Sequence, residues 1–125
     1  MKATEINKDF LEWPGSWSGG KEDLFYSGGL LEIFEAFVAY LDQSGLTKKT
    51  IRRHMSNLWL LGGELVRTIN LEETYDMSPE DHLREELNGV GGPFCRHLGS
   101  EEEWRSYDAT CKKLYKFLHK EKMPV

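Results

Sequence analysis

Several features that assign a chain to a familiar class are scarce in this one. Its 125 residues include 2 cysteines and 4 prolines. No apolar run approaches the roughly 18 residues that cross a bilayer, and no signal peptide opens the chain. These absences argue against a disulfide-rich secreted protein and against a membrane protein. We therefore expect a cytoplasmic protein with reduced thiols and no membrane partner.

Signatures of common chemistry are missing as well. No glycine-rich phosphate loop of the required spacing appears, and neither does a paired zinc motif. No segment alternates polar and apolar residues as a half-buried strand does. The sequence thus predicts neither a cofactor nor a metal site, and it predicts no strands.

What the chain does contain is helical periodicity and enough apolar material for one core. Hydrophobic residues make up 39% and aromatic residues 12% of the sequence, which excludes a disordered chain. The pattern predicts an all-α fold, a small orthogonal four-helix bundle with an irregular N-terminal arm. We expect the arm over 1–22, a single helical domain over 23–120 and a tail over 121–125.

The stretch 34–69 predicts two amphipathic helices joined at Gly45, where a left-handed residue suits the end of the first helix. Ser27 is predicted to cap the first helix, and Thr47 is predicted to cap the second. The second helix carries an apolar stripe at steps of three and four residues. Its members are Ile51, Met55, Leu58, Gly62, Leu65 and Ile69.

Two aromatic and glycine-rich features leave alternatives open. Gly62 and Gly63 stand inside the second helical pattern, so either another backbone approaches closely at Gly62 or the helix breaks there. The segment WPGSWSGG in the arm is punctuated by Gly and Pro, which predicts irregular structure. Trp13 and Trp17 either cover the helical core as lids or form an exposed patch for a partner.

Two further helices are predicted after the central pair. Ser78 followed by Pro79 and two acids is a strong helix start, and Asn88-Gly89 is the predicted end. The sequence SEEE at 100–103 is a capping box that opens the last helix. Its apolar stripe consists of Trp104, Tyr107, Cys111, Leu114 and Leu118.

Charge is distributed in blocks along the chain. The net charge of −5 argues mildly against a nucleic-acid binder, because lysine and arginine drive phosphate contact. The range 48–67 nevertheless carries a local +4, whereas 72–86 carries a local −6 and 112–122 again carries +4. Two basic patches therefore lie on an acidic body.

The first basic patch, Lys48, Lys49, Arg52 and Arg53, crowds the first turns of a predicted helix. Cations there oppose the helix dipole, so an anionic partner would supply a reason for them. Backbone N–H groups and side-chain cations together suit a phosphate group. The alternative is that the acidic range 72–86 neutralises these bases within the protein.

Other candidate groups have simpler explanations. In the second patch, Lys112, Lys116, His119 and Lys120 form a stripe near a helix C-terminus, where bases complement the dipole. Cys95 and His97 are two possible metal ligands without a second pair, which favours an ordinary loop cysteine and histidine. Cys111 lies on the apolar stripe of the last helix and is expected in the core.

A resemblance rests on FVAYLDQSGLTKKTIRRHMSNL, about 35 residues with their flanks. An aromatic helix ending in Tyr-Leu, a Gly-Leu-Thr turn and a Thr-Ile helix start resemble the N-terminal core-binding, SAM-like domain of tyrosine recombinases and phage integrases. The matching residues are Phe37, Tyr40, Leu41, Gly45, Leu46, Thr47, Thr50 and Ile51. The resemblance implies a four-helix unit that cradles duplex DNA. The family's catalytic domain, with its nucleophilic tyrosine, is absent from this chain.

Three functions follow from these observations. The first is a non-catalytic domain that contacts duplex DNA backbone through Lys48, Lys49, Arg52 and Arg53. The second is a cytoplasmic interaction module that binds another protein or itself, with no nucleic acid, as the acidic total and the aromatic arm suggest. The third, an enzyme, requires a pocket that brings Cys95 and His97 together with acidic residues.

Overall fold

The protein is all-α over residues 2–17 and 20–122, which a computed structural model describes, and no strand occurs in these ranges. Short helical turns come first: α1 (Ala3–Ile6), a 3-10 turn (Phe10–Glu12), α2 (Trp13–Trp17) and a second 3-10 turn (Lys21–Asp23). The longer helices follow: α3 (Leu24–Gln43), α4 (Lys48–Glu72), α5 (Pro79–Glu86) and α6 (Glu101–Lys122). The predicted all-α class is confirmed.

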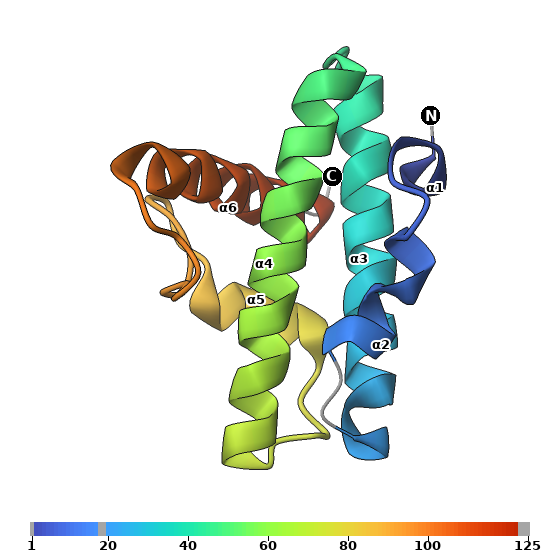
Figure 1. The fold of residues 1–125 in the computed structure, drawn as a ribbon, viewed down its shortest axis with the longest axis vertical. Helices are drawn as coiled ribbons and strands as arrows, with labels where there is room; N and C mark the ends of the chain where they lie inside the picture. Colours follow the sequence, from blue (N-terminus) through green and yellow to red (C-terminus); the bar gives the residue numbers. More distant parts are fainter. Residues whose placement is uncertain (1, 18–19, 123–125) are drawn as a thin grey trace.

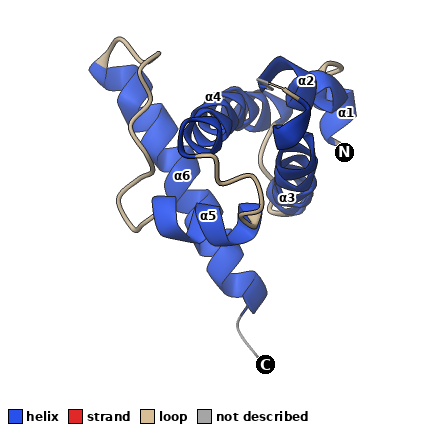
Figure 2. Cartoon of the chain, turned by 90° about the horizontal axis from the view of Figure 1, so that it is seen from below, coloured by secondary structure: helices blue, strands red, loops and turns tan. Residues whose placement is uncertain are grey.

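Helices α3 and α4 form an antiparallel pair that runs the length of the molecule (Figure 1). Seen from below, the pair is viewed nearly end-on, whereas α6 lies across it with α5 alongside (Figure 2). The reversal between α3 and α4 depends on Gly45, whose φ is +84°, a value that L side chains rarely adopt. The Thr47 side chain accepts the Thr50 N–H at 3.2 Å. Both the glycine turn and the Thr47 cap are confirmed.

The start of α3 differs from the prediction. The helix begins at Leu24, directly after the 3-10 turn, so Ser27 lies inside it rather than at its N-cap. The Ser27 side chain is buried, and its hydroxyl has no hydrogen-bond partner within the described residues. The predicted cap was wrong because the 3-10 turn Lys21–Asp23 continues into the helix without a break, one turn before the serine.

The N-terminal arm is also more regular than predicted. Although WPGSW contains Pro and Gly, Trp13–Trp17 forms a short helix, because Pro14 falls in its first turn, where no N–H is required. The Trp13 ring is buried and packs edge-on against Phe10, with ring centroids 4.7 Å apart. Trp17 packs on Phe34 of α3. The expectation that both tryptophans cover the core is confirmed, and residues 18–19 of the segment lie outside the described part.

All six members of the predicted α4 stripe are buried, and α4 is continuous across Gly62. Neither alternative for this glycine was correct, since the group that approaches it is a side chain. The Trp17 ring lies on the helix at Gly62, and a Cβ added there would overlap the ring. The Trp17 N–H also donates to the Trp59 carbonyl at 2.9 Å. A tryptophan from the arm is thereby fixed to the backbone of α4.

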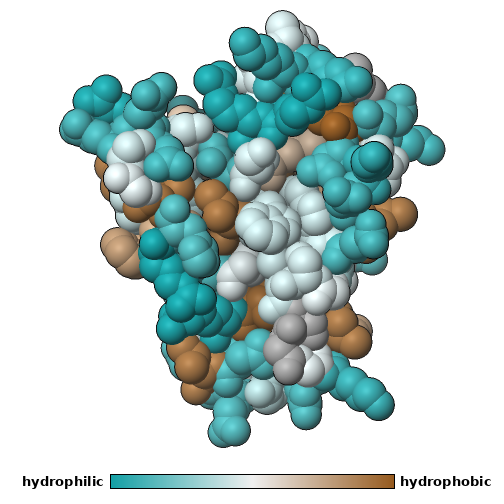
Figure 3. Space-filling view, in the orientation of Figure 1, coloured by the Kyte–Doolittle hydropathy of each residue, from teal (hydrophilic) through white to brown (hydrophobic). Residues whose placement is uncertain are grey.

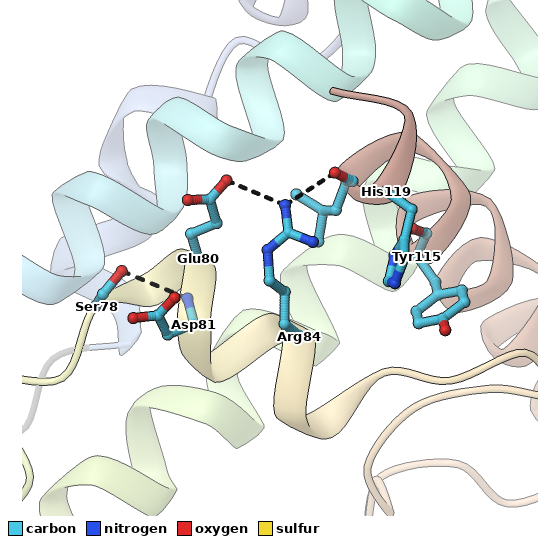
Figure 4. Close-up of polar contacts among 7 residues, drawn as sticks. Ser78, Glu80, Asp81, Arg84, Tyr115 and His119 are labelled. Atoms are coloured by element: carbon cyan, nitrogen blue, oxygen red, sulfur yellow. Dashed lines mark hydrogen bonds and ion pairs between the residues drawn. The ribbon is translucent and has the colours of Figure 1, made fainter. Parts of the chain in front are cut away.

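Helix α5 is tied to its neighbours by polar contacts. Ser78 caps it as predicted, accepting the Asp81 N–H at 3.4 Å, and the helix ends at Glu86, two residues before the predicted stop. Buried Tyr26 of α3 lies 2.6 Å from His82 Nδ1. Arg84 points toward the end of α6, as Figure 4 shows, and donates to the Leu118 carbonyl at 2.9 Å.

The predicted N-cap of α6 and its predicted apolar stripe are both confirmed. Ser100 accepts the Glu103 N–H at 3.1 Å, and the Glu103 carboxylate accepts the Gly99 N–H at 3.0 Å. Four of its five stripe residues are buried, and Trp104 is half-buried. The helix extends through Lys122, into the predicted tail, and residues 123–125 lie outside the described part.

One stretch deserves comparison with the expectation about membranes. Lys21–Gln43 is long and apolar enough to cross a bilayer by length and composition alone. The expectation that no stretch of the chain reaches this length was therefore wrong. Its residues Tyr26, Leu30, Phe34 and Phe37 are fully buried within the protein. A buried core helix and a signal sequence near an N-terminus both pass the same test.

The Gly62–Trp17 contact gives a matched pair of substitutions. We expect Gly62→Ala to lower the free energy of unfolding by up to about 2 kcal/mol, because overpacking costs about 1–3 kcal/mol and alanine returns about 1 kcal/mol of helix propensity. Gly63→Ala is the control, since a Cβ there meets Trp17 Cδ1 at an ordinary 3.6 Å. Denaturant titration should show Gly63→Ala equal to or above wild type. Equal stabilities for the two variants would contradict the packing described.

Candidate nucleic-acid interface

The four predicted bases, Lys48, Lys49, Arg52 and Arg53, all lie exposed at the end of the molecule where α3 turns into α4. None of them forms an ion pair with the residues that the structure describes. The space-filling view shows hydrophilic side chains gathered over this end (Figure 3). The structure therefore brings these four bases together on one accessible surface.

The backbone at this point is also suited to an anion. The Thr50 N–H is taken by the Thr47 side chain, and the Ile51 N–H is taken by the Thr47 carbonyl at 2.9 Å. The amides of Lys48 and Lys49 come before the first intrahelical hydrogen bond, so they point out of the helix end. Partial positive charge from these amides adds to that of the side chains.

The predicted neutralisation by the acidic range 72–86 does not occur. Glu72 is at the opposite end of α4, about 30 Å from Arg52 at 1.5 Å per residue. On the side of α6, Glu102 and Glu103 line a groove together with Arg53.

The second basic patch lies closer to the first than the sequence indicates. Lys112, Lys113 and Lys116 are exposed, and they line a groove of about 510 Å³ together with Ser44 and Leu46 of the α3–α4 turn. The stripe predicted at the C-terminal half of the last helix thus faces the same turn as the first patch. His119 is exposed, with Nδ1 3.0 Å from the Tyr115 carbonyl, and the side chain of Lys120 lies outside the described residues.

His54 links the two patches. It is 6% exposed, and burial lowers the pKa of its imidazole to about 4, with further lowering by Lys113 and Arg53. Because one of these cations belongs to α6 and the other to α4, the two patches converge on either side of this residue. The imidazole is neutral at pH 7, so it adds no charge of its own.

A buried polar network sets how α6 lies against α4. His54 Nδ1 and the Thr110 hydroxyl are 2.7 Å apart. The Asn57 amide donates to the same hydroxyl at 2.9 Å and to the Ser106 carbonyl at 3.1 Å. Polar groups buried in this way favour one arrangement of the two helices, since a shift leaves them unpaired. This network was not predicted from the sequence, although its members, His54, Asn57, Ser106 and Thr110, stand at helical spacing.

Cys95 is a loop cysteine, as expected from the sequence, and its side chain is directed into the core. It is fully buried, and burial, together with the nearby Glu64 carboxylate, raises the pKa of its thiol. His97 is exposed, so thiol and imidazole do not share a pocket. Raised thiol pKa values oppose formation of a nucleophilic thiolate.

Cys111 lies in the core, as expected, with burial raising the pKa of its thiol to about 12. Its Sγ would lie 2.7 Å from a Cβ added at Gly92, so the loop before α6 packs directly on this cysteine. Among the described residues no group of three or more potential metal ligands is assembled.

Comparison with known proteins adds no relative: no family model matches the chain, and neither a curated protein nor a solved structure matches it at a significant level.

Stability should depend on pH through His54. Its folded-state pKa lies below the usual 6.5, so below pH 6.5 the unfolded chain binds more protons, and the free energy of unfolding falls as the pH drops toward 4. The loss should approach about 3 kcal/mol at 1.4 kcal/mol per pKa unit. Urea titrations between pH 7 and 4 should show a weaker dependence for His54→Gln. Exposed His97→Gln is the control, and a curve for His54→Gln that parallels wild type would contradict the assignment.

Proposed function

We propose that this protein is a non-catalytic helical domain that binds duplex DNA through the phosphate backbone, in the manner of a recombinase core-binding domain. The single observation that carries the proposal is the convergence of two basic patches at the α3–α4 turn. One patch comes from α4 (Lys48, Lys49, Arg52, Arg53) and the other from α6 (Lys112, Lys113, Lys116). Concentrating seven cations at one end of a chain of net charge −5 favours a partner of opposite charge.

The arrangement of the helices supports the same proposal. Helix α6 lies across the α3–α4 pair (Figure 2), which is compatible with the orthogonal four-helix bundle of the core-binding type. The cations on α4 and α6 project from two elements at the same end, so they can reach phosphates on both sides of a groove. Such contacts fix position on a duplex and carry little sequence information.

A gel-shift titration with a duplex at low salt tests the proposal. If four or more phosphates are contacted, log K should fall with log salt concentration with a slope of about −4. The Arg52→Glu/Arg53→Glu variant should bind at least tenfold more weakly, and its slope should be shallower by about 2, because each lost contact contributes about 0.9.

The control is Lys8→Glu/Lys21→Glu, which makes the same change in net charge at two exposed lysines outside the interface. It should retain most of the affinity. Absence of binding at tens of micromolar protein, or equal losses for the two double variants, would reject a localised DNA interface.

A second candidate, an interaction module that binds a second copy of itself, is favoured by one observation. Large apolar side chains are exposed at the end opposite the basic patches, with Phe25 87% and Leu71 68% exposed. The Asn70 amide donates to Asp23 at 2.6 Å, which brings the start of α3 beside the end of α4. Leu24, Phe25 and Leu71 therefore lie at the same end of the molecule, and a symmetric pair of such ends would bury them.

Sedimentation equilibrium tests this second function. Wild type should form dimers whose proportion rises with concentration, and Phe25→Ser/Leu71→Ser should be monomeric with an unchanged melting temperature, because both side chains are exposed in the monomer. A wild-type protein that stays monomeric at hundreds of micromolar would rule self-association out.

A further inference from the structure

A groove on the outward face of α4 shares Leu71 with the self-association surface and no residue with the basic patches. It has a volume of about 520 Å³, within the usual range for small-molecule sites. Its lining combines the apolar side chains of Trp59, Leu60 and Leu71 with the polar side chains of Arg67, Arg96 and His97. Figure 3 shows pale, weakly polar surface over the part of the molecule where α2 lies against the middle of α4.

The Trp59 ring is held rigidly by hydrogen bonds. The Trp59 indole N–H donates to the Ser16 hydroxyl at 3.1 Å, and that hydroxyl donates to the Trp13 carbonyl at 2.8 Å. The Trp17 N–H donates in turn to the Trp59 carbonyl. Both indoles are therefore fixed, yet Trp59 remains 43% exposed. A fixed, partly exposed aromatic ring is a platform on which another ring can stack without loss of side-chain freedom.

The arginines that line the groove give it a net positive charge. Arg67 is exposed, and Arg96, with 53% of its side chain exposed, has Glu64 as its nearest acid at 3.9 Å. The Glu64 carboxylate also accepts the Arg96 backbone N–H at 3.3 Å. Two guanidinium groups against one carboxylate leave an excess cation, with the His97 imidazole beside them. Arginine suits phosphate because its planar group can bind two oxygens at once.

On the other side of Trp59 the charge is reversed. The adjoining groove shares Trp59 and Leu60 but is lined by Asp9 and Glu12. An anionic ligand stacked on Trp59 is therefore directed toward Arg67 and Arg96 and away from the N-terminal arm. The difference in charge between the two sides of the Trp59 indole fixes the orientation of a ligand that has a flat ring at one end and an anionic group at the other.

From this geometry we infer that the groove binds a nucleotide, with the base stacked on Trp59 and the phosphate held by Arg67 and Arg96. The same chemistry serves a free nucleotide or one unit of a single-stranded nucleic acid. An acidic peptide is disfavoured because the groove offers one aromatic ring and two leucines as apolar contacts. A docked amphipathic helix needs a row of apolar contacts at helical spacing. The inference does not depend on the duplex-binding proposal, since it uses no residue of the basic patches.

Calorimetric titration at low salt tests the inference with three probes: thymidine monophosphate, thymidine and a ten-residue oligothymidylate. The monophosphate should bind saturably and quench tryptophan fluorescence, and thymidine should bind at least tenfold more weakly because it lacks the phosphate. An oligothymidylate that binds far more tightly than the monophosphate identifies a single strand as the ligand. Equal affinities of the oligothymidylate and the monophosphate identify the free nucleotide as the ligand.

Two variants separate this site from the basic patches. Arg67→Ala/Arg96→Ala should weaken monophosphate binding about tenfold or more, and Trp59→Leu should weaken it and reduce the quenching, with folding checked by circular dichroism. Arg52→Ala/Arg53→Ala is the matched control and should bind the monophosphate as wild type does, whatever its affinity for duplex DNA.

The inference is overturned if thymidine monophosphate does not bind at millimolar concentration, or if thymidine binds with the same affinity as the monophosphate. It is equally overturned if Arg67→Ala/Arg96→Ala binds like wild type. A decaglutamate peptide that displaces the monophosphate at lower concentration than the oligothymidylate would instead assign the groove to acidic peptides.

Discussion

The contact between the Trp17 ring and Gly62 is the constraint on which much of this structure depends. Only a residue without Cβ lets an indole lie on the backbone of α4, and the helix tolerates the glycine because the ring replaces the missing packing. The same contact anchors the N-terminal arm, seats Trp13 in the core and leaves Trp59 fixed at the surface. One small residue thus determines both the closure of the core and the shape of the outward face of α4.

A second constraint acts between α4 and α6. The hydrogen bonds of His54, Asn57, Ser106 and Thr110 select one position of α6 on α4, whereas apolar contacts alone would allow it to slide. That position brings the lysines of α6 to the α3–α4 turn. A buried, neutral network therefore controls the arrangement of exposed charge, and the electrostatic character of the turn follows from packing in the interior.

The sequence predicted the elements that local chemistry determines. Gly45, the caps at Thr47, Ser78 and Ser100, and the stripe of α4 depend on spacing and on residue type within a few positions. Ser27 was misjudged because a 3-10 turn upstream had already started the helix. The partner of Gly62, the meeting of the two basic patches and the groove beside Trp59 join residues that lie far apart in the sequence, which periodicity cannot reveal.

The hydrogen bond between Tyr26 and His82 has a consequence for synthesis on the ribosome. The two residues are 56 positions apart, so α3 is complete long before the partner of its buried phenol has been made. Until α5 emerges, the first long hairpin exposes a polar group and apolar surface that the finished protein hides. Nascent chains of this protein consequently depend on late-made residues to cover the first long helix, and a chain truncated after α4 would remain vulnerable to aggregation and proteolysis.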